Sequence, residues 1–148
     1  MLFLPIDQSI HAVVSYVAAF AFLIPSLVTD IKKKKISVPL CIAGILSGIV
    51  LSVVFGDVRA SLTGLIPGIC LTAIAYLSKE AIGTGDGLIL TMIGSLFGFW
   101  KSIAVLFTAL LFAMVIALIL LVIKRAGRKT EFPFVPFLLA GVAVSVFV

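Results

Sequence analysis

The sequence predicts an all-α membrane protein with six transmembrane helices, folded as a single domain over residues 1–148. Apolar residues occupy 63% of the 148 positions, whereas charged residues occupy only 11%. A soluble domain of this length has too small an interior to bury that much apolar surface, so the surrounding solvent must be lipid. Short connections separate the apolar segments, which favours one domain over several.

Six apolar segments are candidates for the spans, because a spanning helix needs about 20 apolar residues. A long apolar run towards the C-terminal half is expected to divide at a tight turn formed by Trp100 and Lys101. The predicted spans are residues 10–28, 38–55, 60–77, about 84–99, 102–123 and 132–148. The fourth and sixth spans are short, so we expect their ends to lie near the interface or in space lined by protein.

The distribution of cations predicts the orientation. The first, third and fifth connections hold nine of the eleven Lys and Arg residues, whereas the second and fourth hold only Arg59 and Lys101. Cation-rich loops stay in the cytoplasm, which predicts cytoplasmic odd-numbered loops and both termini on the outer side. The start of the chain has no basic segment and contains Asp7, so we expect the first helix to be retained. The chain is therefore predicted to be a multi-pass protein of the cell (cytoplasmic) membrane.

Charge and cysteine content exclude two other kinds of site. The net charge of +5 is explained by orientation in the lipid bilayer, and nucleic-acid binding would need a basic face in water. Cys41 and Cys70 lie inside apolar runs and do not form a CxxC pair, so no zinc site is expected. We expect neither a metal nor another cofactor.

Two aspartates at the same edge of the membrane are the strongest functional signal. Asp30 closes the first apolar segment and Asp86 opens the fourth, 56 residues later but at the same predicted depth. Acids at the border of the hydrocarbon layer are costly and usually have a partner or a function. Contact between the first and fourth spans would bring this pair together. The other acids lie in loops or near the chain start, where water solvates them: Asp7, Asp57, Glu80 and Glu131.

A pair of carboxylates can hydrolyse a peptide bond when the two groups hold opposite protonation states. The ionised carboxylate takes a proton from the attacking water, and the protonated one donates a hydrogen bond to the scissile carbonyl. Two carboxylates a few ångströms apart share one proton, because they cannot easily both ionise. This chemistry requires no metal. The residues leave open which aspartate is the base.

Glycines and prolines accompany the two acids. Gly83, Gly85 and Gly87 alternate around the second aspartate and would let the backbone of an extended substrate approach closely. A flexible start to a membrane helix is the alternative interpretation. Pro133 and Pro136 would unwind the start of the last helix beside the site, although proline is also ordinary in the first turn of a helix.

The segment Gly83-Thr84-Gly85-Asp86 resembles the GxGD motif of intramembrane aspartyl proteases, and within that clan the chain is most similar to type IV prepilin peptidases. Asp30, followed by a basic stretch and Ile36, is similar to the first aspartate motif of that family. The proline-rich segment 132–137 resembles the entry to its final helix. The resemblance covers residues 26–141. It implies an aspartyl endopeptidase, with Asp30 and Asp86 catalytic, that cuts the leaders of type IV pilin-like or pseudopilin precursors at the cytoplasmic face.

The chain departs from the family pattern in three respects. Ser37 and Val38 separate Ile36 from the proline that often follows it directly, and Leu88 replaces a frequent Lys. The zinc-binding insertion of larger members has no counterpart, which implies a peptidase without methyltransferase activity. If the substrate is such a precursor, Glu80 would contact its basic leader. Alternatively, Glu80 is an ordinary loop residue that water solvates.

Two other functions stay open. Paired acids also occur in small proton- or cation-coupled transporters, although here both acids lie at one edge with no polar chain across the bilayer. A non-catalytic assembly subunit, in which Asp30 or Asp86 pairs with a lysine, is the third candidate. The sequence specifies neither the pathway, whether pilus biogenesis or protein secretion, nor the oligomeric state.

Overall fold

The fold is all-α, as predicted. The computed structural model describes residues 4–33, 36–55, 57–79, 83–123 and 133–147, and these residues contain helices and no strand. In chain order the helices are α1 (Leu4–Lys33), α2 (Val38–Phe55), α3 (Val58–Leu77), α4 (Thr84–Phe97), α5 (Phe99–Val122) and α6 (Val135–Phe147). Four of them (α1, α2, α3 and α5) are long and apolar enough to cross a membrane. The other two, with 14 residues in α4 and 13 in α6, are shorter.

Several predicted helix boundaries differ from the structure. The break between α4 and α5 lies at Gly98, whereas the sequence had suggested a turn at Trp100 and Lys101. Gly98 has a φ of 83°, a left-handed conformation that glycine adopts without steric cost. A single residue therefore turns the chain, and the aromatic and basic residues that follow belong to the first turn of α5. The first helix also continues past residue 28, so that Asp30 lies in its last turn.

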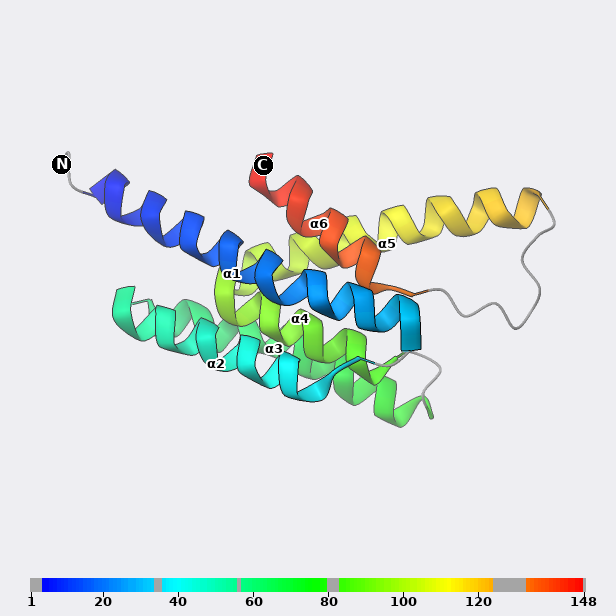
Figure 1. Cartoon of the computed structure of the whole chain (residues 1–148), viewed down its shortest axis with the longest axis horizontal. Helices are drawn as coiled ribbons and strands as arrows, with labels where there is room; N and C mark the ends of the chain where they lie inside the picture. Colours follow the sequence, from blue (N-terminus) through cyan, green and yellow to red (C-terminus); the bar gives the residue numbers. More distant parts are fainter. Residues whose placement is uncertain (1–3, 34–35, 56, 80–82, 124–132, 148) are drawn as a thin grey trace.

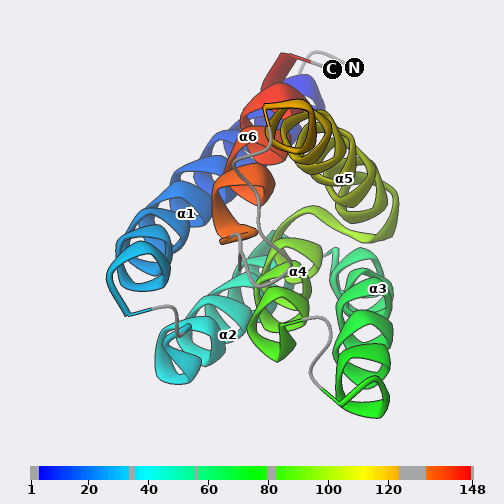
Figure 2. The same cartoon turned by 90° about the vertical axis from the view of Figure 1, so that its right-hand side faces the viewer.

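The helices form a bundle of two rows. The carboxyl ends of α1, α3 and α5 and the amino ends of α2, α4 and α6 lie at the same end of the bundle (Figure 1). Viewed from that end, one row consists of α1, α6 and α5, and the other of α2, α4 and α3 (Figure 2). The two short helices α4 and α6 are the middle members of their rows, and they contact each other. Their amino ends therefore lie inside the bundle.

The position of α4 is set by close packing against both neighbours in its row. Residues 89–96 of α4 are all buried. Small residues bring α3 almost backbone to backbone with α4, at Gly64 on Gly94, Gly68 on Thr91 and Thr72 on Gly87. On the other side, α2 contributes Gly44 against Met92 and Gly48 against Ser95. Close approach through small residues is how helices associate in lipid, and here it fixes the depth of α4.

Helix α1 turns one stripe of residues towards the bundle interior. Its buried residues recur every three or four positions, at Ser15, Ala19, Leu23, Ser26 and Asp30. This spacing corresponds to one face of an α-helix. Asp30 is therefore the last member of a packed face, which explains why its carboxylate points inwards although it lies at the helix end.

Candidate active site

Asp30 is held inside the bundle by the start of another helix. Its side chain is only 8% exposed. The backbone N–H of Val135, the first residue of α6, donates a hydrogen bond to its carboxylate. The second carboxylate oxygen, Oδ2, is buried and has no hydrogen-bond partner among the described residues. One oxygen is thus bound by the protein, whereas the other is buried and lacks a hydrogen-bond donor among the described residues.

Asp86 lies in the first turn of α4 and is half-buried. Its backbone N–H donates to the carbonyl of Gly83 at 3.1 Å, which closes the turn that begins the helix. Its carboxylate lies above the same glycine, since a Cβ built on Gly83 would be 3.0 Å from Oδ2 of Asp86. The charge of Asp30 acts on the Asp86 carboxyl, and α1 contacts α4. The structure therefore brings the two predicted acids together at one end of the bundle.

The three glycines around Asp86 have different surroundings. Gly83 is exposed, and the atoms closest to its bare face are those of the Asp86 carboxylate. Gly85 is covered by Ile36, with the isoleucine Cβ only 2.7 Å from where a glycine Cβ would lie. Gly87 is buried against the backbone of Thr72 in α3. Gly83 therefore leaves its bare face to the Asp86 carboxylate, whereas the other two glycines allow neighbouring segments to pack.

Comparison with known proteins agrees with this geometry. The family model described as the Type IV leader peptidase family matches residues 17–122, which include both aspartates and the glycines between which Asp86 lies. The chain belongs to this family. No curated protein and no solved structure matches the chain. Membership makes the protein a leader-peptidase-like protease and confirms the resemblance noted in the sequence.

Two prolines of this leader peptidase family member lie on either side of Val135, the residue whose N–H donates to Asp30. Pro133 precedes α6 and Pro136 lies in its first turn, and both are half-buried. Val135, between them, provides the N–H that reaches Asp30. The sequence predicted that the proline segment lies beside the site, and the backbone at the start of α6 does lie there. Glu80 lies outside the described residues.

Two contributors to the site were not predicted from the sequence, namely the Val135 N–H and the side chain of Ile36. A backbone donor leaves no signature in the residue type, so Val135 gave no signal. Ile36 was noted as part of the first aspartate motif, but its contact with Gly85 joins segments distant in sequence. The sequence did contain a signal for the inward direction of Asp30, because small and apolar residues recur every three or four positions along α1.

Within the described ranges, no group of three or more His, Cys, Asp or Glu side chains lies close enough to hold a metal ion. The groups described at the site of the leader peptidase are the two carboxylates and the Val135 N–H.

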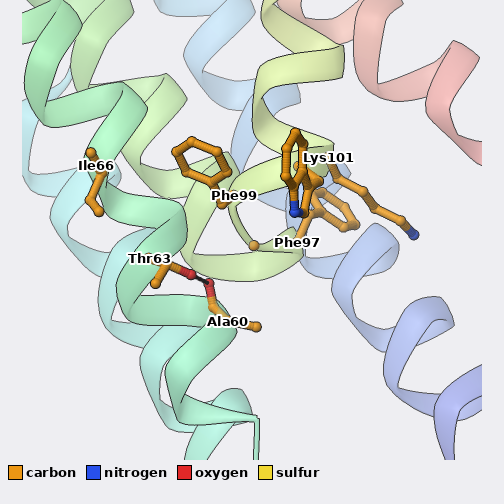
Figure 3. A pocket seen from close by; sticks show the side chains of 8 residues that line it. Ala60, Thr63, Ile66, Phe97, Phe99 and Lys101 are labelled. Atoms are coloured by element: carbon orange, nitrogen blue, oxygen red, sulfur yellow. Dashed lines mark hydrogen bonds between the residues drawn. The ribbon is translucent and has the colours of Figure 1, made fainter.

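A cavity of about 440 Å³ lies at the opposite end of the bundle, beside the turn that joins α4 to α5. Figure 3 shows Ala60, Thr63 and Ile66 of α3 on one side and Phe97, Phe99 and Lys101 on the other. Trp100 and Gly98 complete the lining, which is mostly apolar. Because this hollow is far from the carboxylates and contains no acid, we do not assign the reaction to it.

Proposed function

We propose that the protein is a membrane-embedded aspartyl endopeptidase that removes the leaders of type IV pilin-like or pseudopilin precursors at the cytoplasmic face of the membrane. One observation carries this proposal. Asp30 and Asp86 come from different rows of the bundle, yet lie at the same end and near enough for the charge of one to act on the other. Membership of the leader peptidase family supports this substrate class.

The depth of the site suits a substrate anchored in the bilayer. A helix of 14 residues, such as α4, is about 21 Å long, which is less than the roughly 30 Å of the hydrocarbon layer. A helix this short leaves at least one of its ends below the membrane surface, which is compatible with Asp86 lying in space lined by protein. The apolar helix of a precursor could stay in lipid while the bond at its cytoplasmic end reaches the acids. Gly83 is exposed beside the Asp86 carboxylate, so an extended backbone could approach the acid from that side.

The interior beyond Asp86 argues against the transporter alternative. In α4 the side chains of Ile89, Leu90 and Ile93 are fully buried and apolar. The hydroxyls of Thr91 and Ser95 donate to backbone carbonyls of their own helix, at 2.7 Å each. An ion relay needs successive polar or ionisable groups across the bilayer. Beyond Asp86, α4 has no ionisable residue, and its two buried hydroxyls are bound within the helix.

Replacement of either acid tests the proposal. In purified protein with a tagged precursor pilin, Asp30→Asn and Asp86→Asn should each slow cleavage at least ~100-fold, because each removes a general acid or base. Asp57→Asn is the matched control, since Asp57 is exposed next to the amino end of α3, at the other end of the bundle. It should cleave normally. Mass spectrometry of the product should find the leader lost and no added methyl group.

Two outcomes would contradict the proposal. Normal cleavage by Asp30→Asn or Asp86→Asn would show that the two carboxylates do not act as a pair. Ion uptake into proteoliposomes that depends on Asp86, in the absence of cleavage, would favour the transporter.

A further inference from the structure

The backbone N–H of Val135, at the start of α6, has its acceptor outside the helix. The carbonyl of Phe134 accepts hydrogen bonds from the N–H groups of Phe137 and Leu138, at 3.0 and 3.2 Å. Pro136 has no N–H. Val135 therefore contributes the first N–H of the helix, and that N–H is directed at Asp30. The first donors of a helix need partners outside it, and here the partner is a candidate catalytic carboxylate.

The hydrogen bond to Val135 leaves the two oxygens of Asp30 in different situations. One accepts from the backbone, whereas Oδ2 is buried and without a partner in the described part of the chain. A buried polar atom is rarely left without a hydrogen bond, so Oδ2 calls for a donor that binds there. The neighbouring acid, Asp86, is half-buried beside the exposed Gly83, and no backbone N–H of the described residues donates to its carboxylate.

We propose that the amino end of α6 is a positioning element for Asp30: the Val135 N–H fixes the carboxylate so that Oδ2 faces the attacking water. This makes Asp30 the general base and Asp86 the proton-carrying partner. A donated hydrogen bond favours the ionised form of a carboxylate. The helix dipole does not distinguish the two acids, because Asp86 itself lies in the first turn of α4. The inference rests on the proposed function, because it assigns roles within the same pair.

The proton transfers then balance over one cycle. Asp30 Oδ2 takes a proton from water as the water oxygen bonds to the scissile carbonyl carbon, and the carbonyl oxygen takes the proton of Asp86. The resulting diol collapses as the C–N bond breaks. The leaving nitrogen takes the proton held by Asp30, and one diol hydroxyl returns a proton to Asp86. The products are a carboxylic acid and an amine, and both aspartates recover their starting states.

Replacement of Val135 by proline tests the positioning role. Val135→Pro removes the N–H at the first helical residue, a position where proline is well tolerated. Val135→Ala is the matched control, because it retains the N–H while shortening the same buried side chain. We expect kcat of Val135→Pro to be at least about tenfold below that of Val135→Ala, given the strength of hydrogen bonds to charged groups. KM for the precursor should be equal in the two variants.

Equal kcat in the two variants would overturn the positioning role, and so would a change confined to KM. If Val135→Pro does not fold, the α-hydroxy acid analogue of valine at position 135 removes the same N–H without a ring. For the analogue, kcat should fall relative to that of the wild type, whereas KM for the precursor should stay the same. Retained cleavage by Asp30→Asn, in contrast, would end the proposed function itself, so the two failures are distinguishable.

The assignment of the base has a separate readout. Asparagine at position 86 can still donate an N–H to the scissile carbonyl, whereas asparagine at position 30 cannot accept a proton from water. Asp86→Asn should therefore retain a residual single-turnover rate several-fold above that of Asp30→Asn. Equal residual rates, or the reverse order, would overturn the assignment of Asp30 as the base.

Discussion

At the scale of single residues, the contact between Ile36 and Gly85 links the segments that follow and precede the two acids. Ile36 lies six residues after Asp30, and Gly85 immediately precedes Asp86. The glycine leaves space that the isoleucine fills, with a built Cβ only 2.7 Å from the Ile36 Cβ. This contact therefore contributes to holding the two carboxylates at a set separation.

Gly85→Ala should destabilise the protein by about 1–3 kcal/mol, because the added methyl overpacks a filled site. In a free helix the same change is stabilising, since alanine has the higher helix propensity, so a loss can be attributed to the contact. Ile36→Ala should relieve part of the loss, giving a double variant more stable than the sum of the single effects. Thermal unfolding in detergent and the cleavage rate measure this coupling. Additive effects would show that the two residues do not interact.

The residues of the site differ in how far the sequence could predict them. Asp30 and Asp86 were found because ionisable groups are rare at the edge of apolar segments and because charge patterns placed both at one end. The sequence did not distinguish among the three glycines, since the face that each one leaves bare depends on which helix packs there. The role proposed for Val135 belongs to its backbone, and residue type carries no information about it.

At the scale of helices, the contact between α3 and α4 determines where Asp86 lies. Gly64 and Gly94 meet backbone to backbone, and a Cβ on Gly94 would lie 2.6 Å from the carbonyl carbon of Gly64. No side chain can move aside to make room at such a contact. The depth of the end of α4 that carries Asp86 therefore depends on glycines towards the other end of the bundle.

Gly94→Ala should separate α3 from α4 and destabilise the protein by about 3 kcal/mol, at the upper end of what overpacking costs. Ile69→Ala on α3 is the control, because Ile69 is 56% exposed and does not face α4. It should leave both the unfolding temperature in detergent and the cleavage rate close to those of the wild type. Normal stability of Gly94→Ala would contradict the backbone contact as described.

Helix lengths were partly predictable from apolar runs, and their ends less so. The bounds of α2 were predicted correctly, because the flanking residues 34, 35, 37, 56 and 57 are polar or glycine. The end of α1 was predicted too early, since a helix does not stop where apolar residues stop: Lys32 and Lys33 continue it. The turn at Gly98 was misplaced because one glycine, without a polar loop, is enough to reverse the chain.

At the scale of the whole molecule, the candidate site lies between the two rows rather than within either. Asp30 is bound to α6 within its own row, and Asp86 is fixed by α2 and α3 in the other. Away from the acids, the hydroxyl of Tyr16 donates to the carbonyl of Ser145 at 2.8 Å, while its ring packs on Phe97 at 4.6 Å. This cross-row contact joins α1, α4 and α6 at the end opposite the site.

The two-row arrangement also makes the sidedness of the reaction testable. Lys33 and Lys101 are both exposed and lie at opposite ends of the bundle, and Lys33 is within one turn of Asp30 on α1. In a background with Cys41 and Cys70 replaced by alanine, we expect Lys101→Cys to react with a membrane-impermeant maleimide added to intact cells. Lys33→Cys should react only after the cells are permeabilised, because the cation-rich connections are predicted to be cytoplasmic.

Since Lys33 and Asp30 share the last turn of one helix, the side on which Lys33→Cys reacts is also the side on which the candidate site lies. Labelling of Lys33→Cys in intact cells would place the acids at the outer face. A precursor whose basic leader remains in the cytoplasm could not then be cut there, even if both aspartates proved essential. Retained cleavage by the two cysteine variants is the necessary control, because it shows that the labelled molecules have the active fold.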